Sequence, residues 1–160
     1  MEDDQILEKT HPELASLVGN WQGTTKTWFK PDELADESEW QGEMKLVLGG
    51  RFLLYTYQGG LQGNPFEGVA LLGYNPQRSR YEMAWVDSFH NGSAIMFSHG
   101  GDKAGAFNVL GSFPTGPDSP DWGWRTEVLP QEDGTLIITH YGVTPDGDEW
   151  KGVETVYSKV

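Results

Sequence analysis

Short turn signals recur along the chain after Val18, and their spacing constrains the fold more than any other feature of the sequence. Pairs such as Gly49-Gly50 and Asn91-Gly92 separate runs that are rich in β-branched and aromatic residues. Most of the connections have the length of a hairpin loop, and none is long enough for the crossover that parallel strands need. The sequence therefore predicts an antiparallel meander, in which each strand pairs with the next one along the chain.

The predicted strands share a β-rich composition and a turn signal at each end. We expect them at about residues 20–29, 38–48, 51–59, 65–74, 79–90, 93–100, 104–112, 122–129, 135–143 and 149–158. A twisted sheet of about ten strands tends to close on itself or to split into two packed sheets. No repeat or shift in composition divides the chain, so we predict one all-β domain over residues 1–160, a single antiparallel up-and-down β-barrel.

One short helix is expected before the first strand, in the stretch THPELASLVG. Thr10 and Glu13 have the spacing of a capping box, and Pro12 suits the first turn. Gly19 is placed to end the helix. Because so short a helix is not stable in isolation, we expect it to dock on the barrel and close one end.

The balance of charge and the lack of cysteine exclude several classes of function. The chain has 11 Lys and Arg against 24 Asp and Glu, a formal net charge of −13. Nucleic acids and anionic membranes attract basic surfaces, so neither is an expected partner. Without Cys, the chain has no disulfides, thiolate nucleophiles or cysteine-ligated metals. The acidic N-terminus MEDDQILEK lacks the apolar core of a signal peptide, and we expect a cytoplasmic protein.

Alternation in the second and third predicted strands identifies residues that face the interior. Trp40 and Met44 alternate with charged and polar residues, which places them inward. If the GG pair that follows forms a two-residue turn, Leu48 pairs with Arg51. Directly paired residues share one face of the sheet, so the third strand also has an inward row. The members of this row are Arg51, Leu53, Tyr55 and Tyr57.

Trp21 stands close to two glycines at the start of the first strand, in LVGNWQG. Alternation places Trp21, Thr25 and Thr27 inward. Because the first strand runs antiparallel to the second, Trp21 is expected at the same end of the barrel as Arg51. A guanidinium over an indole contributes about 0.5–2 kcal/mol. We expect Trp21 and Arg51 to form a structural plug at that end.

The later strands add polar residues to the expected interior. In the strand before the NG pair we place Trp85 and Asp87 inward, which leaves an apolar outer strip that suits a homodimer contact. A tight turn at the NG pair would place Asp87 opposite Met96. In the last hairpin, alternation places His140 and Glu154 inward. An inward carboxylate needs a partner or a raised pKa, and His140 is one candidate partner.

Five stretches are similar, in order and spacing, to a bacterial family known as domain of unknown function 1579. They are LVGNWQGTTKTWF, LGGRFLLYTYQG, NPFEGVALLGYN, YEMAWVDS and GVTPDGDEWKGVETVYS, and they run from about Leu14 to Tyr157. The resemblance implies a calycin-like barrel, the group that includes lipocalins, fatty-acid-binding proteins and nitrobindins. It supplies no established activity or catalytic residues. His140 departs from the family pattern because an apolar residue is expected there, and the GPDSPDWGW stretch is longer than expected.

The sequence contains no established catalytic or metal-binding signature. HExxH, GxSxG, Walker and Rossmann motifs are all absent. The TPDGDE stretch lacks the ligand spacing of a calcium loop, and the spacing of the four His does not provide a zinc site. We therefore expect no metal and no cofactor, with one alternative. That alternative is a haem whose iron is ligated by His140.

We predict that the barrel binds a small apolar or amphipathic molecule in its interior. The candidate ligand-binding residues are Trp40, Arg51, Tyr55, Tyr57, Trp85, Asp87, His140 and Glu154. The second hypothesis is an acid–base enzyme that uses the same cavity, such as an isomerase, cyclase or hydrolase, with Asp87, His140 and Glu154 as candidates for proton transfer. The third is a structural or dimerisation module whose barrel is packed solid.

Overall fold

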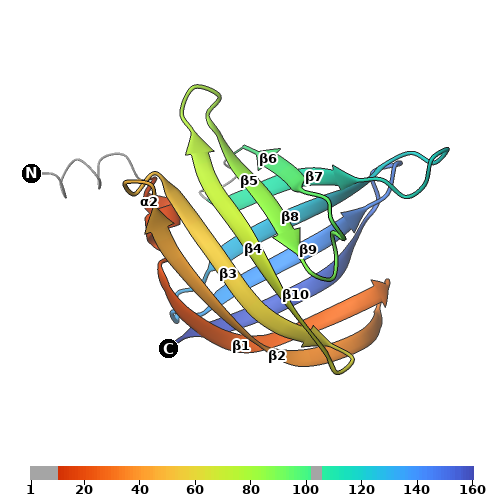
Figure 1. Ribbon diagram of the computed structural model, residues 1–160, viewed down its shortest axis with the longest axis horizontal. Helices are drawn as coiled ribbons and strands as arrows, with labels where there is room; N and C mark the ends of the chain where they lie inside the picture. Colours follow the sequence, from red (N-terminus) through yellow and green to blue (C-terminus); the bar gives the residue numbers. More distant parts are fainter. Residues whose placement is uncertain (1–10, 102–105) are drawn as a thin grey trace, which may run out of the picture.

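Each strand pairs with the next one along the chain, and β1 also pairs with β10, so that the sheet closes into a barrel (Figure 1). The structure is a computed structural model that describes residues 11–101 and 106–160. Its strands are β1 (Gly19–Lys30), β2 (Glu33–Val47), β3 (Phe52–Leu61), β4 (Asn64–Asn75), β5 (Arg80–Asp87), β6 (Met96–Gly100), β7 (Phe107–Phe113), β8 (Trp122–Pro130), β9 (Leu136–Val143) and β10 (Glu149–Lys159). Every pairing in the barrel is antiparallel, which confirms the predicted fold class and strand order.

Buried and exposed residues alternate along the strands as the sequence predicts. The expected register of β2 and β3 is confirmed, since Met44 lies opposite Tyr55 and Gly42 opposite Tyr57. The buried Tyr57 ring packs against Gly68 of β4, where an added Cβ would lie only 2.1 Å from Cζ of the ring. A glycine at this position therefore allows a tyrosine ring to fill the interior.

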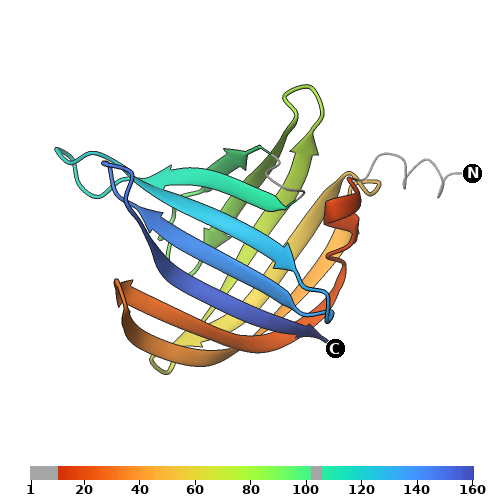
Figure 2. The ribbon, with the colours of Figure 1, turned by 180° about the vertical axis from the view of Figure 1, so that it is seen from behind.

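The helix α2 (Pro12–Ala15) covers one end of the barrel (Figure 2). His11 caps the helix through its Nδ1, which accepts a hydrogen bond from a backbone N–H group. Thr10, the predicted cap, lies outside the described residues. The carbonyl of the buried Leu17 accepts a hydrogen bond of 3.0 Å from Nε1 of Trp21, which ties the segment after the helix to the wall of the barrel. Among the described residues, no helix is long and apolar enough to cross a membrane.

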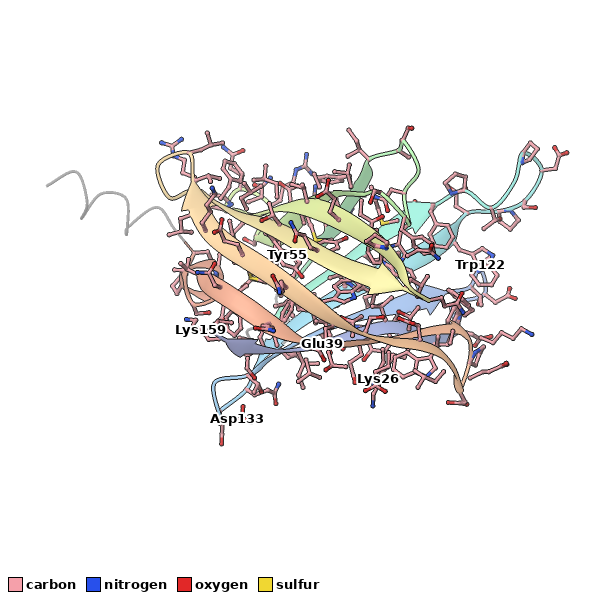
Figure 3. The ribbon with its side chains drawn as sticks, turned by 60° about the horizontal axis from the view of Figure 1, so that its bottom comes forward. Lys26, Glu39, Tyr55, Trp122, Asp133 and Lys159 are labelled. Atoms are coloured by element: carbon pink, nitrogen blue, oxygen red, sulfur yellow. The ribbon has the colours of Figure 1, made fainter. Side chains whose placement is uncertain are left out.

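The barrel has two different ends, which we call the α2 end and the far end. The turn that carries Asp133 and the end of β10 at Lys159 lie at the α2 end, whereas Trp122 at the start of β8 lies at the far end (Figure 3). The loops between β5 and β6, β7 and β8, and β9 and β10 all lie at the far end (Figure 1). The covered end and the loop-bearing end therefore give the interior two distinct surroundings.

The hairpin of β5 and β6 confirms one prediction and corrects another. Trp85 and Asp87 are buried, so the predicted inward face of β5 is right. The register differs from the expected one by two residues, because Trp85 rather than Asp87 pairs with Met96. The Asp87 carboxylate accepts hydrogen bonds from the backbone N–H groups of Phe89 and His90, and these bonds turn the chain at the end of β5.

The outer face of the central strands carries the apolar strip expected from the sequence. Its exposed members include Val69, Val86, Phe97 and Leu110. The homodimer contact that such a strip suits stays a prediction.

Arg51 does not face the interior. The last pair of β2 and β3 is Val47 with Phe52, and residues 48–51 form the turn beyond it. Arg51 is exposed in this turn, and the cation near Trp21 is instead Lys159, whose Nζ lies 5.2 Å from the ring centroid. The predicted inward position of Trp21 is therefore right, and the predicted contact with Arg51 is wrong.

After its β-bulge, strand β10 faces the opposite way from the prediction. Thr155 and Tyr157 are buried, whereas Glu154 lies on the outer face, where its carboxylate pairs with Nζ of Lys151 at 2.7 Å. The prediction of an inward Glu154 assumes that the side chains of Lys151 and Lys159 both point outward. Lys159 shares its parity with the buried residues and lies at the barrel end, and a β-bulge just after Lys151 shifts the register.

Candidate functional site

The interior of the barrel is filled mainly by aromatic and aliphatic side chains. The cavity that remains has a volume of about 30 Å³ and extends from Leu17 near α2 toward the far end. This volume is enough for about two water molecules. Its polar and aromatic lining consists of Trp40, Tyr55, Tyr57, Trp85, His90, Trp124, Thr126, His140 and Thr155. Closely packed rings, rather than an empty lumen, therefore make up the candidate site.

Three rings lie nearly parallel at the far end, one each from β5, β8 and β9. The centroid of the His140 ring is 5.8 Å from that of Trp85 and 5.5 Å from that of Trp124, with interplanar angles of 12° and 13°. The two indoles are 6.2 Å apart at 6°. Trp124 is half-buried, and its buried Nε1 has no acceptor in the described part of the chain. We call these three residues the ring stack.

His140 is held as a neutral imidazole within this stack. Its Nδ1 lies 2.9 Å from Oγ1 of Thr126 on the neighbouring strand, and the tautomer decides which atom donates. Burial, together with the charge of the nearby His90, lowers the pKa of His140 to about 3. Over residues 11–101 and 106–160, Nε2 of His140 has no hydrogen-bond partner. The stack therefore contains one neutral ring nitrogen that is free to bond to a ligand.

A chain of hydrogen bonds runs beside the stack and ends at His90. Nε1 of Trp85 donates to the hydroxyl oxygen of Tyr57 at 2.8 Å, and that hydroxyl donates to Oδ2 of Asp87 at 2.8 Å. Nδ1 of His90 lies 2.6 Å from the same Oδ2. The backbone N–H groups of Phe89 and His90 donate to Oδ1. The carboxylate is thus bonded through both oxygens, and its orientation is fixed.

Asp87 carries the negative charge of this network. Burial raises the pKa of Asp87, but the hydrogen bonds and charge of His90, with a smaller contribution from Tyr57, leave that pKa below its usual value. Burial first, and then the Asp87 charge, raise the pKa of Tyr57 well above its usual value. Tyr57 is therefore a neutral donor to an ionised carboxylate.

A second group of aromatic side chains packs together between the ring stack and α2. The rings of Trp40 and Tyr57 are stacked, with centroids 5.2 Å apart and an interplanar angle of 5°. The hydroxyl groups of Tyr55 and Tyr157 are 2.6 Å apart, and burial raises the pKa of both. The three tyrosines are buried and hydrogen-bonded to one another or to Asp87, so they have less freedom to move than Trp124. The buried Nε1 of Trp40, by contrast, has no hydrogen-bond partner among the described residues.

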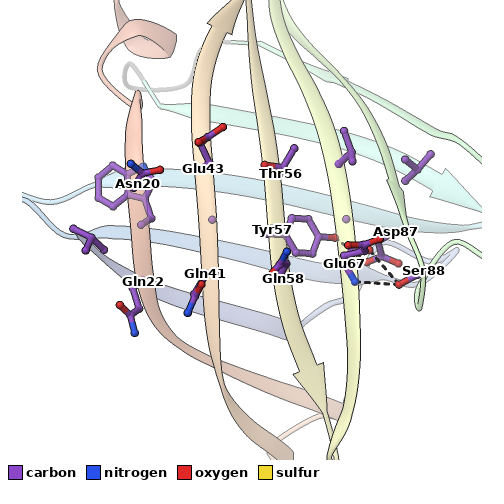
Figure 4. Close-up of a pocket in the computed structure, with 16 residues that line it drawn as sticks. Asn20, Gln22, Gln41, Glu43, Thr56, Tyr57, Gln58, Glu67, Asp87 and Ser88 are labelled. Carbon is purple, nitrogen blue, oxygen red and sulfur yellow. Dashed lines mark hydrogen bonds between the residues drawn. The ribbon is translucent and has the colours of Figure 1, made fainter.

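A second, larger hollow opens on the outside of the barrel, and its lining includes Tyr57 and Asp87 of the wall. It is an open groove of about 790 Å³ across the outer face of β1 to β5 (Figure 4). Gln22 pairs with Gln41, Gln41 with Gln58, and Gln58 with Glu67, so four polar side chains form a row across it. We place the candidate site inside because the buried, mutually oriented polar groups lie there.

The structure brings together six of the eight residues predicted to bind a ligand. Trp40, Tyr55, Tyr57, Trp85 and His140 line the cavity, and Asp87 lies directly behind Tyr57. Arg51 and Glu154 lie elsewhere, in an exposed turn and on the outer face. Among the described residues, no group of three or more His, Cys, Asp or Glu side chains is arranged to hold a metal ion.

Two members of the site, His90 and Trp124, are missing from the sequence prediction. His90 follows the inward Asp87 by three residues. At this spacing, an Asp at the end of a strand can accept hydrogen bonds from the backbone of the turn and from the histidine side chain. Trp124 shares its parity with the buried Thr126 and Val128, so alternation along β8 indicates its inward position.

Comparisons with known proteins give the family and the fold. A family model described as "Protein of unknown function (DUF1579)" matches residues 7–159. Among solved structures, the chain is similar to the crystal structure of Rv2717c from M. tuberculosis, with a TM-score of 0.59 and 16% sequence identity. The match covers 94% of this chain and 99% of that chain, and at this identity it shows the fold alone. No curated protein matches the chain.

Proposed function

The chain belongs to the DUF1579 family of proteins of unknown function, and we propose that it binds a small, planar, uncharged molecule in the ring stack at the far end of the barrel. The observation that supports this proposal most is the parallel arrangement of Trp85, Trp124 and His140. Aromatic rings favour offset stacking on one another, and such pairs contribute about 0.5–1.5 kcal/mol beyond the area they bury. A planar ligand would therefore use the same faces that these rings now offer to each other.

A ligand needs more space than about 30 Å³, and Trp124 is the side chain best able to provide it. Its ring is half-buried, and its Nε1 has no acceptor in the described part of the chain, so rotation outward would break no hydrogen bond of that atom. Tyr57, by contrast, would lose its bonds to Trp85 and Asp87 if it moved. We therefore propose that the ligand takes the place of the Trp124 ring.

The lining of the site indicates the charge and polarity of the ligand. The lining residues include no Lys or Arg, and the nearest anionic group, Asp87, is already bonded through both oxygens. Binding sites of this kind combine apolar walls with a few polar groups that orient the ligand. Nε2 of His140 would supply that orienting contact as a neutral nitrogen. An uncharged aromatic compound with one or two polar atoms fits these features.

A haem ligated by His140 has less support than a small planar ligand. The His140 ring is flanked by Trp85 and Trp124 at centroid distances below 6 Å, and the cavity has space for about two waters. A macrocycle would need several of the interlocked rings to leave the interior. The residues present therefore do not fit a haem in the observed arrangement.

N-phenylnaphthylamine, an uncharged planar fluorophore, is a direct probe for the proposed site. We expect the native chain to enhance the fluorescence of the probe saturably. Trp124→Ala should bind the probe at least as tightly as the native chain. Trp85→Ala should bind it about tenfold more weakly, which is equivalent to about 1.4 kcal/mol. Trp28→Ala is the matched control, because Trp28 lies on the outer face beside Lys151, and it should bind like the native chain. No saturable binding by either the native chain or Trp124→Ala would instead favour a solid structural barrel.

A further inference from the structure

We propose that His90 is a catalytic base, positioned by Asp87, and that the barrel catalyses keto–enol tautomerisation of a small ketone that carries an aromatic ring and binds at the ring stack. This inference rests on the proposed function, because the ketone is a member of the same ligand class. It adds a reaction, a catalytic residue and a positioning residue to a binding site.

The bond between Asp87 and His90 fixes which nitrogen of His90 is free. A carboxylate only accepts hydrogen bonds, so Nδ1 of His90, 2.6 Å from Oδ2, carries the hydrogen. In the neutral ring, Nε2 then has the lone pair that accepts a proton. Within the described residues Nε2 of His90 has no hydrogen-bond partner. The pair therefore has the arrangement of a base whose tautomer is set by a carboxylate.

The position of the ring places this base at the ligand. His90 lines the same cavity as the ring stack, and its centroid is 5.6 Å from that of Trp85 and 6.4 Å from that of Trp124. Its side chain is 21% exposed, whereas that of Asp87 is fully buried. His90 therefore lies at the boundary between the cavity and solvent, where a proton can be exchanged with a bound molecule and with water.

The surrounding residues hold the pair in place from behind. Asp87 accepts hydrogen bonds from the Tyr57 hydroxyl and from two backbone N–H groups in addition to His90. When His90 takes up a proton, the resulting imidazolium faces an ionised carboxylate that is already oriented toward it. Asp87 therefore holds the His90 ring in one orientation throughout the reaction.

The proposed step needs no reagent other than the ketone. Nε2 of His90 takes a proton from the carbon next to the carbonyl, and the electron pair of that C–H bond forms the C=C bond while the carbonyl π pair moves to oxygen. The imidazolium then returns the same proton to the enolate oxygen, which gives the enol and restores neutral His90.

The same bonds also anchor the loop between β5 and β6, so the test must separate catalysis from anchoring. His90 in the described structure bonds to no Ser or Thr hydroxyl, so the pair is suited to proton transfer rather than to activation of a side-chain nucleophile. A purely structural pair would hold the loop in place and leave the exchange of a ketone's protons at the rate in buffer. Proton exchange on a bound ketone is therefore the property to measure.

Exchange of the α-protons of phenylacetone in deuterated buffer, followed by NMR, provides this measurement on the full chain. We expect the native protein to accelerate exchange saturably, and His90→Gln to lose about 10²-fold in rate, the lower range of general-base effects. Asp87→Asn should lower kcat with little change in KM, since it acts through His90. His99→Gln is the matched control, because His99 is an exposed histidine on β6, and it should retain the native rate.

Binding of N-phenylnaphthylamine distinguishes the failure of this inference from the failure of the proposed function. If the native protein binds the probe but does not accelerate exchange, or if His90→Gln retains the native rate, the catalytic proposal is wrong and the binding site stands. If neither binding nor exchange is detected, both are wrong. Should His90→Gln fail to fold, modification of the native protein with diethylpyrocarbonate replaces it. Loss of exchange must then parallel carbethoxylation of His90, and exchange that survives complete modification overturns the proposal.

Discussion

The two ends of the barrel interior are built from similar residues but differ in how completely their polar atoms are bonded. At the α2 end, Trp21 is 5% exposed and its N–H donates to a carbonyl, and the buried Tyr157 hydroxyl is bonded to that of Tyr55. At the far end, Trp124 is half-buried and its N–H has no acceptor among the described residues, while one nitrogen of His140 is also free. Two tryptophans in one core thus have different local environments.

This difference indicates that one end of the hydrophobic core contributes mainly to stability and the other mainly to binding. Satisfied and fully buried groups contribute most to stability, because their removal leaves cavities and unpaired polar atoms. Groups with unpaired donors contribute less, and they keep hydrogen-bonding capacity for a ligand. We therefore expect stability to be concentrated at the α2 end and binding at the far end.

The largest expected effect is on the two tryptophans themselves. Trp21→Ala should lower the free energy of unfolding by about 3–5 kcal/mol, because it empties a buried site and removes the hydrogen bond to Leu17. Trp124→Ala should cost less than half as much, since its ring is half-buried and loses no hydrogen bond. Urea unfolding followed by circular dichroism measures both. Equal costs for the two substitutions would remove the basis for a stable end and an adaptable end.

The next effect concerns the buried pair of tyrosine hydroxyls. Tyr157→Phe removes one partner of the 2.6 Å contact and leaves the Tyr55 hydroxyl without it, at a cost of about 1–3 kcal/mol. The double variant Tyr55→Phe/Tyr157→Phe should be close to the native stability, because no buried hydroxyl is then left unpaired. A double-mutant cycle from urea unfolding gives the coupling energy. Additive losses would show that the hydroxyls do not depend on each other.

The sequence predicts the barrel well because its signals for strands are local. Turn pairs such as Gly49-Gly50 set the ends of β2 and β3, and the alternation around Trp40 sets which side of them is buried. The inward and outward assignments depend on the two-residue alternation of side chains along a strand, which holds until a bulge or turn interrupts the strand. The inward position of Trp85 follows from the same alternation.

The parts of the site that the sequence does not predict depend on features that break this alternation. The loop after β5 is shaped by hydrogen bonds from two backbone N–H groups to Asp87, which bring His90 back over the interior. Glu154 is predicted on the wrong face because of a bulge and a lysine at the barrel end. Arg51 lies in a turn, where strand alternation no longer applies. Turn conformations and bulges are set by contacts that only the folded chain contains.

A pH dependence of stability tests whether His140 is neutral. Its pKa is about 3 in the folded chain and about 6.5 in the unfolded chain, so the unfolded state binds the additional proton. The stability that neutral His140 preserves is complete above about pH 6.5 and is lost as the pH falls toward 3. Between pH 7 and pH 5, the native chain should therefore lose about 1–2 kcal/mol more than His140→Gln does.

Urea unfolding at the two pH values measures this difference, and His99→Gln provides the control. His99 is exposed on β6, so removing it should leave the pH dependence of the native chain unchanged. An identical loss for the native chain and His140→Gln would mean that the His140 ring is protonated or solvated in the folded state. The far end would then be polar, and the case for an uncharged ligand would weaken.

The smallest effect is expected outside the barrel, at the carboxylate that alternation along β10 places inside. Glu154→Gln removes the charge from a pair with Lys151, whose side chain is 41% exposed, and such surface pairs contribute about 0–1 kcal/mol. The substitution should therefore change the free energy of unfolding by less than about 0.5 kcal/mol and leave N-phenylnaphthylamine binding unaltered. Asp87→Asn, which neutralises a carboxylate with no exposed side-chain surface, should cost clearly more, because hydrogen bonds to charged groups are worth about 1.5–3 kcal/mol. If Glu154→Gln instead weakened both stability and probe binding, the Glu154 side chain would have to face the interior in solution. The contrast between the two ends of the barrel would then have to include an inward carboxylate.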